Sequence, residues 1–258
     1  MSQTTYESFP EVGLPGLRGD LEHGYTRTYN NTLEIINFGR IVSKISGEEV
    51  GCKLPATSGD YLLGAALQAQ ALQLNSQYAL NSAVAVLSRG TIYVETEEAI
   101  TPDDAVYVRY DGKSQVQTIT FDADLVASNT IDLKIDGVSM TQITYASTHL
   151  DTMNAIASQI TTDFSQIATA TVGGASNRVL TLTAAVHATD FVISDIVVAG
   201  GLSQAGSTVA ETVASISDDD RGKIRTDADS STAVAFTGAR VVRSGEAGKL
   251  AVIEINLP

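Results

Sequence analysis

The pattern of hydrophobic positions predicts a chain built mainly from short β-strands. Within residues 78–110, apolar runs at 83–87 and 91–95 are separated by a Ser-Arg-Gly turn signal, and residues 106–110 alternate in polarity. A period of two is typical of a half-buried strand, and turn residues between apolar runs mark strand ends. We therefore predict three strands in this stretch.

Similar patterns predict strands on both sides of it. A strand over 33–45 is interrupted near Phe38 and Gly39, because a glycine inside a strand often marks a bulge or a kink. Residues 62–74 suit either a helical turn or an extended strand, and we favour a strand that leads into an irregular stretch. The remaining predicted strands outside the central region are residues 50–54, 233–236, 239–243 and 250–257.

The first 32 residues have no sustained periodicity. Pro10, Pro15 and four glycines between residues 13 and 24 prevent a helix or a strand from extending. The segment nevertheless carries apolar side chains such as Phe9. It is either a disordered leader or an arm that lies along its own or a neighbouring surface, and we predict an extended N-terminal arm over residues 1–32.

Residues 115–213 differ from the rest because they carry nine acidic and only two basic residues. They also contain the one convincing helical pattern, a stripe of apolar side chains at spacings of three and four. The stripe consists of Leu150, Met153, Ile156, Ile160, Phe164 and Ile167. Thr148 and Asp151 fit a capping box at its start. Predicted strands surround it at 118–121, 130–135, 139–145, 168–172, 179–183 and 191–198.

These patterns predict a mainly β fold made of two domains. The first is a β-rich base, barrel-like or sandwich-like, formed by residues 33–114 together with 214–258. The second is a small α+β domain over 115–213, with one helix on an antiparallel sheet. Because polar linkers flank this second domain, we interpret it as an insertion in a surface loop that faces outward.

Charge and composition restrict the function. A net charge of −14 argues against nucleic-acid binding and against binding to anionic membranes, although acidic surfaces also simply keep proteins soluble. No signal peptide is evident and no apolar run reaches the length of a membrane span, so we expect synthesis in a cytoplasm.

Candidate chemistry is sparse. Cys52 is the only cysteine, and we interpret it as a half-buried structural thiol. His23, His149 and His187 have no ligand or triad partner at a telling spacing, so we expect surface residues. The acidic clusters at 95–98, 103–104, 218–220 and 227–229 lack the pattern of a calcium loop and are interpreted as solvated turns. We predict no catalytic, cofactor or metal site.

The segments 85–94 (AVLSRGTIYV), 100–109 (ITPDDAVYVR), 222–225 (GKIR) and 247–258 (AGKLAVIEINLP) occur in this order on the two sides of the insertion. Their sequence resembles the structural cement, or head decoration, proteins of tailed bacteriophages. Residues 35–40 (IINFGR), after a segment rich in proline and glycine, are similar to this family as well. The resemblance leaves out the insertion.

The resemblance implies a non-enzymatic protein on the outer surface of a phage capsid. Such proteins bridge neighbouring major capsid subunits and stabilise the head against the pressure of packaged DNA. The implied partners are the major capsid protein and further copies of the chain, as a homodimer or a homotrimer. No cofactor is implied.

From its residues, the arm is the element that we expect to make capsid or inter-subunit contacts. The residues selected are Phe9, Leu14, Pro15, Leu17 and Arg18. An alternative hypothesis is a virion surface adhesin in which the inserted domain binds host glycans or proteins. A hydrolase with two unmarked carboxylates is a third hypothesis, and the scarcity of aromatic side chains weighs against it.

Overall fold

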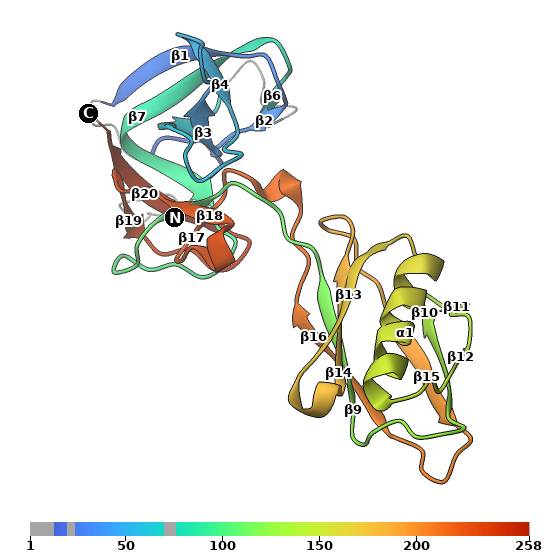
Figure 1. Cartoon of the computed structure of the whole chain (residues 1–258). Coiled ribbons are helices and arrows are strands. Elements are labelled where there is room, and N and C mark those ends of the chain that lie inside the picture. Colours follow the sequence, from blue (N-terminus) through green and yellow to red (C-terminus); the bar gives the residue numbers. More distant parts are fainter. Residues whose placement is uncertain (1–12, 20–23, 70–75, 258) are drawn as a thin grey trace, which may run out of the picture. The chain divides into compact units, whose positions relative to one another are not determined.

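The computed structural model describes residues 13–19, 24–69 and 76–257. The fold is mainly β with one α-helix, which confirms the predicted fold class (Figure 1). The described residues up to Asp111, together with those from Asp219 onward, form one compact unit, here called unit 1, and Gly112–Asp218 form unit 2. No helix among the described residues is long and apolar enough to span a membrane.

Unit 1 is built almost entirely from strands. They are β1 (Tyr25–Asn31), β2 (Ile36–Asn37), β3 (Ile41–Lys44), β4 (Gly51–Lys53), β5 (Leu62–Ala66), β6 (Gln77–Tyr78), β7 (Ser82–Glu95), β8 (Tyr107–Arg109), β17 (Ile224–Arg225), β18 (Ala233–Ala235), β19 (Ala239–Arg243) and β20 (Leu250–Asn256). A short 3₁₀ turn, η4 (Asp229–Ser231), precedes β18.

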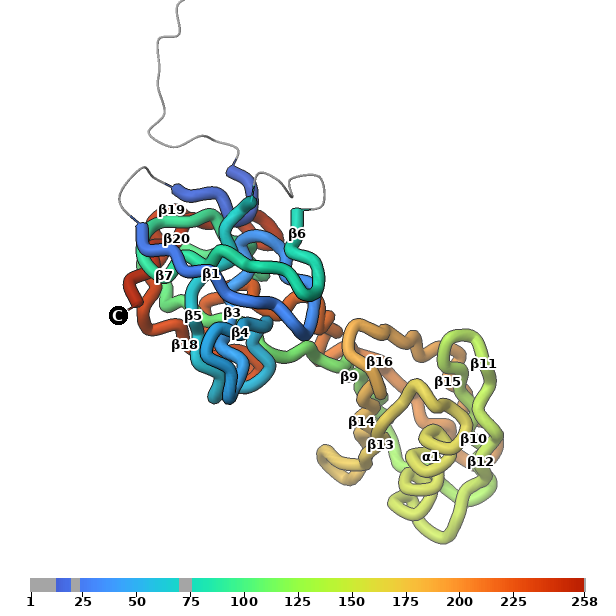
Figure 2. Tube along the Cα trace, turned by 90° about the horizontal axis from the view of Figure 1, so that it is seen from above, coloured from blue at the N-terminus to red at the C-terminus, as the bar shows by residue number. Residues whose placement is uncertain are grey.

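Five of these strands form a closed, barrel-like ring. The order is β1-β4-β3-β5-β7, and β7 also pairs with β1, which closes the ring (Figure 2). Beyond β7 the same sheet continues through β20 to β19. Closing a sheet on itself leaves fewer exposed strand edges and encloses a core. The cluster to which all five strands contribute includes the fully buried Val42, Cys52 and Val84, with Tyr29 of β1 packed against it.

The longest strand, β7, corrects one prediction. Its 14 residues form one continuous strand, whereas two strands separated at Ser88, Arg89 and Gly90 were predicted. Gly90 adopts a φ of +125°, which only glycine accepts easily, so it bends the strand instead of ending it. Before this bend β7 pairs with β1 and β5, and after it with β20.

The strand β1 lies inside the segment that was predicted to be an arm. All seven of its residues pair with β7 in antiparallel register, from Tyr25 opposite Arg89 to Asn31 opposite Ser82. Its sequence YTRTYNN lacks an apolar face, which is why its periodicity did not identify it. The pairing with β7 imposes the extended conformation.

The end of the chain returns to unit 1 through a three-stranded sheet. β8 lies in its centre, with β17 on one side and β18 on the other. The fully buried Val108 and Ile224 join this sheet to the core below the ring. Residues on either side of unit 2 in the sequence therefore complete one fold.

Unit 2 contains the helix and eight strands. They are β9 (Val116–Phe121), β10 (Thr130–Ile135), β11 (Val138–Ser139), β12 (Ile143–Thr144), α1 (His149–Asp163), β13 (Ile167–Gly173), β14 (Val179–Ala184), β15 (Ile193–Ala199) and β16 (Ser207–Val213). Short 3₁₀ turns occur at η2 (Ala175–Asn177) and η3 (Asp218–Asp220), the latter at the boundary between the units.

Two four-stranded sheets, rather than one, enclose the core of unit 2. One has the order β13-β14-β9-β16, and in the other β10 pairs with β11, β12 and β15. The edge strand β16 was not predicted, because its mostly exposed sequence STVAETV carries no apolar alternation. The chain enters and leaves unit 2 side by side, since Lys113 and Ile216 exchange two backbone hydrogen bonds of 2.9 Å.

The helix α1 begins as predicted. The Thr148 hydroxyl accepts a hydrogen bond from the backbone N–H of Asp151 (3.1 Å). Hydrogen bonds from the Ser147 and Thr148 hydroxyls hold the pKa of the Asp151 carboxyl below its usual value. Met153, Ile156 and Ile160 are fully buried, while Leu150 is exposed.

Candidate functional site

Residues 14–19 form an additional edge along the second half of β7. The N–H of Gly16 donates to the carbonyl oxygen of Tyr93 (2.8 Å), and the N–H of Tyr93 donates to the oxygen of Leu17 (2.9 Å). A further bond joins Gly19 to Thr91, and Arg18 pairs with Ile92 as an antiparallel bridge. This part of the predicted arm is therefore bound to its own fold, on the edge of β7 that β20 leaves open.

A close contact between two glycines fixes this segment. Gly16 and Gly39 both have positive φ angles, +76° and +75°, which disfavour any residue with a Cβ atom. A Cβ on Gly16 would lie 2.8 Å from the backbone oxygen of Ala66 and 2.9 Å from the nitrogen of Gly39. The Gly16 oxygen also accepts a hydrogen bond from the N–H of Gln68 (2.8 Å). The backbones approach this closely only because both positions are glycine.

The residues selected from the sequence surround this glycine. Leu14 is 50% exposed and Leu17 is 36% exposed, Arg18 is exposed and Pro15 is half-buried. Phe9 lies outside the described residues. Four of the five residues, which are neighbours in the sequence, therefore lie on one short segment whose backbone is anchored and whose leucine side chains remain accessible.

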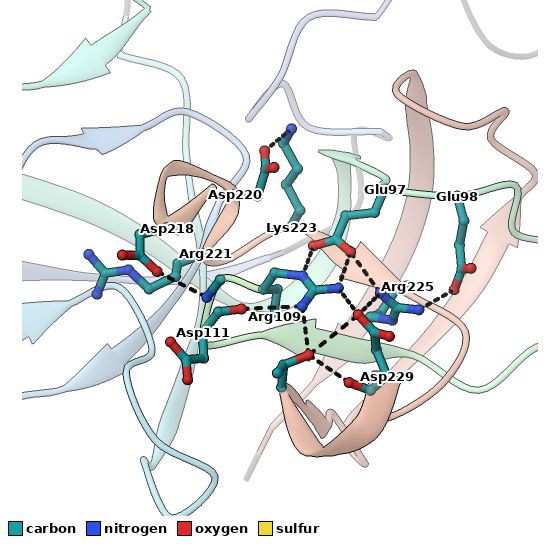
Figure 3. A network of polar contacts seen from close by, with 12 residues as sticks. Glu97, Glu98, Arg109, Asp111, Asp218, Asp220, Arg221, Lys223, Arg225 and Asp229 are labelled. Carbon is teal, nitrogen blue, oxygen red and sulfur yellow. Dashed lines mark hydrogen bonds and ion pairs between the residues drawn. The ribbon is translucent and has the colours of Figure 1, made fainter. Parts of the chain in front are cut away.

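A second feature of unit 1 is a buried network of charged groups next to β8. Arg109 has a fully buried side chain, and its guanidinium group faces Glu97, Asp229 and the Thr232 hydroxyl (Figure 3). Burial lowers the pKa of Arg109, but its hydrogen bonds to Glu97 and Asp229 outweigh burial, so the pKa is raised above its ordinary value. The guanidinium group therefore carries a permanent charge.

The neighbouring Arg225 connects the same carboxylates. It donates to Glu97 (2.9 Å) and to Asp229 (2.9 Å), and it also binds Asp227 (2.8 Å). The prediction that these acidic clusters are solvated turns is wrong for Glu97 and Asp229, whose side chains are only 11% and 15% exposed. Arg109, which lies in the predicted strand over residues 106–110, was the signal that such partners exist, whereas the strand β17 that carries Arg225 was not predicted.

The network joins segments that are distant in the sequence. Glu97 follows β7, Arg109 ends β8, Arg225 ends β17, and Asp229 lies in η4. The Glu97 and Asp229 carboxylates each form ion pairs with both guanidinium groups. Charge-assisted hydrogen bonds of this kind are among the stronger polar contacts in proteins. We conclude that this arrangement fixes the three-stranded sheet against the end of β7.

Other candidate groups have structural roles. Cys52 is completely buried, and burial raises the pKa of its thiol to about 12, which makes it a poor nucleophile. The prediction of a surface role for His149 is wrong: its side chain is only 12% exposed, and Nδ1 accepts from the N–H of Leu125 (3.0 Å). His23 lies outside the described residues.

A comparison with known protein families also indicates a structural protein. A family model described as structural cement protein (E217 gp24/Pam3 gp6) matches residues 2–256. The chain belongs to this family of phage structural cement proteins. The resemblance found in the sequence motifs is thereby confirmed. The match spans unit 2 as well, which the motif resemblance had left out. No curated protein matches the chain.

Membership of the family establishes a coarse function. The chain is a structural cement protein that associates with capsid proteins, and its location is the virion capsid. A structural phage family weighs against the hydrolase hypothesis. The anchored segment at residues 14–19 is therefore a candidate contact with another protein.

Proposed function

We propose that this cement protein binds the outer surface of an assembled capsid and bridges neighbouring major capsid subunits. A protein that binds the assembled shell better than free subunits stabilises the shell by mass action, without any catalytic group. Unit 1 is the part that contacts the shell in this proposal, unit 2 faces outward, and copies of the chain associate as a dimer or a trimer. Several contacts per assembly add avidity.

The observation that carries the proposal is the presentation of Leu14 and Leu17. Their backbone is fixed to Tyr93 by two hydrogen bonds, yet about half of the Leu14 side chain and a third of the Leu17 side chain remain exposed. A pre-ordered segment loses little conformational entropy on binding, so its apolar surface contributes more to affinity. Pro15 and Arg18 lie on the same segment, and Phe9 precedes it.

The test is a double substitution, Leu14→Ser with Leu17→Ser, measured as occupancy on purified heads that lack the cement protein. Burying the exposed parts of two leucines contributes about 2 kcal/mol, which corresponds to a roughly 30-fold loss of affinity. The matched control is Leu202→Ser, at a fully exposed leucine of unit 2. Equal occupancy of the double variant and the control would exclude the arm contact.

Deleting residues 2–20 is a less clean experiment. The deletion removes Gly16 together with its hydrogen bonds to Tyr93 and Gln68, so it exposes the edge of β7 as well as removing the leucines. Loss of occupancy then has two causes. The two serine substitutions leave the backbone bonds in place.

The adhesin hypothesis concerns unit 2, and the paired entry and exit strands make it testable. Because Lys113 and Ile216 lie opposite each other, a short Gly-Ser linker can replace residues 114–215. If unit 1 carries the cement function, heads decorated with the shortened protein should keep their stability. If unit 2 is an adhesin, particles that carry the shortened protein should adsorb less to cells.

A further inference from the structure

The ring of unit 1 is incomplete along part of β1. All of β1 pairs with β7, but on its other edge only Asn30 and Asn31 pair with β4. No other strand among the described residues pairs with residues 25–29 on that edge. The first four residues of β1 are exposed. A five-residue length of strand edge is therefore open to an additional strand.

One face of β1 lines a hollow in unit 1. Because side chains alternate along a strand, Tyr25, Arg27 and Tyr29 share one face of β1, and all three line a hollow of about 160 Å³. Lys44 at the end of β3 and Tyr61 just before β5 line it as well. These five residues are here called the β1 groove.

The composition of the β1 groove is that of a protein-binding surface. Tyrosine and arginine are enriched among the residues that dominate binding energy, and Tyr25 and Tyr61 are 52% and 62% exposed. The Arg27 guanidinium carbon lies 5.1 Å from the centre of the Tyr25 ring, and its Nε donates to the Tyr25 hydroxyl (3.1 Å). These contacts hold Arg27 in place.

The charge of the groove is opposite to that of the chain. Arg27 and Lys44 belong to the groove, and Glu49 is the single acidic residue that lines the same hollow, in a protein of net charge −14. Neither cation forms an ion pair with any residue in the described part of the chain. An approaching segment with carboxylate groups would find two available partners there.

We propose that the β1 groove receives an extended, acidic segment of a major capsid subunit, which adds to β1 as an edge strand. Main-chain hydrogen bonds to residues 25–29 give affinity in this mode, and alternate side chains entering the hollow give specificity. This inference rests on the proposed binding to the capsid and names the surface and the partner chemistry.

A second copy of the chain fits the groove less well. Antiparallel pairing of two β1 strands about a twofold axis, centred on their middle, would place Arg27 near Arg27 of the other copy. Like charges directly opposite each other destabilise strand pairing. Charge therefore favours an acidic capsid segment over β1 of another cement protein.

The experiment compares two substitutions on the same strand, Arg27→Glu on the groove face and Thr28→Glu on the opposite face. Binding of full-length protein to heads that lack it is measured at two salt concentrations. We expect Arg27→Glu to weaken binding more than tenfold and Thr28→Glu to bind within about twofold of the wild type. Wild-type binding should weaken at high salt. Thermal unfolding of both variants excludes a folding defect.

A photo-crosslinking residue in place of Tyr25 then identifies the occupant on decorated heads. A crosslink to an acidic segment of the major capsid protein supports the proposal. Binding of Arg27→Glu at the wild-type level overturns it, as does a crosslink to another copy of this chain. If the wild type itself fails to bind heads, the proposed function falls first, and the wild-type measurement separates that outcome from failure of the groove alone.

Discussion

Replacing Gly16 with alanine tests how the N-terminal segment is held. The new Cβ would lie 2.8 Å from the Ala66 oxygen and from the Gln68 nitrogen, distances that real Cβ contacts essentially never show. All of these neighbours are backbone atoms, so no side chain can rotate out of the way. Either the segment leaves β7 or the backbone around Gly39 shifts.

The expected cost has two parts. A left-handed φ of +76° costs an alanine roughly 1–2 kcal/mol. The overlap adds the loss of the hydrogen bonds that Gly16 makes with Tyr93 and Gln68, each worth about 1 kcal/mol. If the segment stays against β7 with both hydrogen bonds broken, the sum is about 3–4 kcal/mol. If the segment detaches, the φ strain is relieved, and the loss in free energy of unfolding cannot exceed the free energy with which the segment was bound.

Hydrogen exchange at the Tyr93 amide is the most direct assay, because that N–H donates to Leu17 and becomes exposed when the segment detaches. The matched control is Gly47→Ala, at a φ of +81° with no atom within 4 Å of the added Cβ. The control should lose only the conformational part, about 1–2 kcal/mol in urea unfolding, and should leave the Tyr93 amide protected. Equal effects of the two substitutions on unfolding and on exchange would refute the contact argument.

Two further predictions concern unit 1. Arg109→Gln leaves Glu97 and Asp229 buried next to less positive charge. We therefore expect the free energy of unfolding, measured by thermal unfolding, to fall by about 3 kcal/mol. A decrease below about 1 kcal/mol would contradict the role of the network. Burial raises the pKa of Cys52 from 9.0 to about 12, so the folded protein keeps the thiol protonated while the unfolded chain ionises near pH 9. The free energy of unfolding should therefore decrease as the pH rises from about 9 toward 12. At about pH 8 a thiol reagent should modify Cys52 only after the protein unfolds. Rapid modification of the native protein would disprove the burial of this thiol.

Local signals in the sequence were sufficient where neighbouring residues decide the structure. Thr148 and Asp151 cap α1 through bonds between adjacent residues, and the buried stripe of Met153, Ile156 and Ile160 follows from helical spacing. The ordered motifs on either side of the insertion were enough to identify the family, which the family match confirms. These features needed no long-range information.

Local sequence signals failed to predict strands whose conformation depends on pairing with a distant strand. β1 has no apolar alternation, and its extended conformation comes from pairing with β7 more than fifty residues later in the sequence. The edge strand β16 likewise owes its form to β9. At Gly90 the local turn signal was real, but pairing with β1 before the bend and β20 after it kept β7 continuous. Long-range hydrogen bonds overrode local preference in all three cases.

For the candidate site too, some features follow from the sequence and others only from the tertiary structure. The sequence by itself determined the fold class and the capped helix, because both depend on spacing along the chain, and it indicated the family through the resemblance of its motifs. It also proposed the arm residues as candidates. Only the tertiary structure decided that Leu14 and Leu17 are held against β7, that Arg109 and Arg225 share the carboxylates of Glu97 and Asp229, and that Arg27 faces a hollow. The physical reason is that these contacts join residues far apart in the sequence, and folding alone brings them within hydrogen-bonding distance.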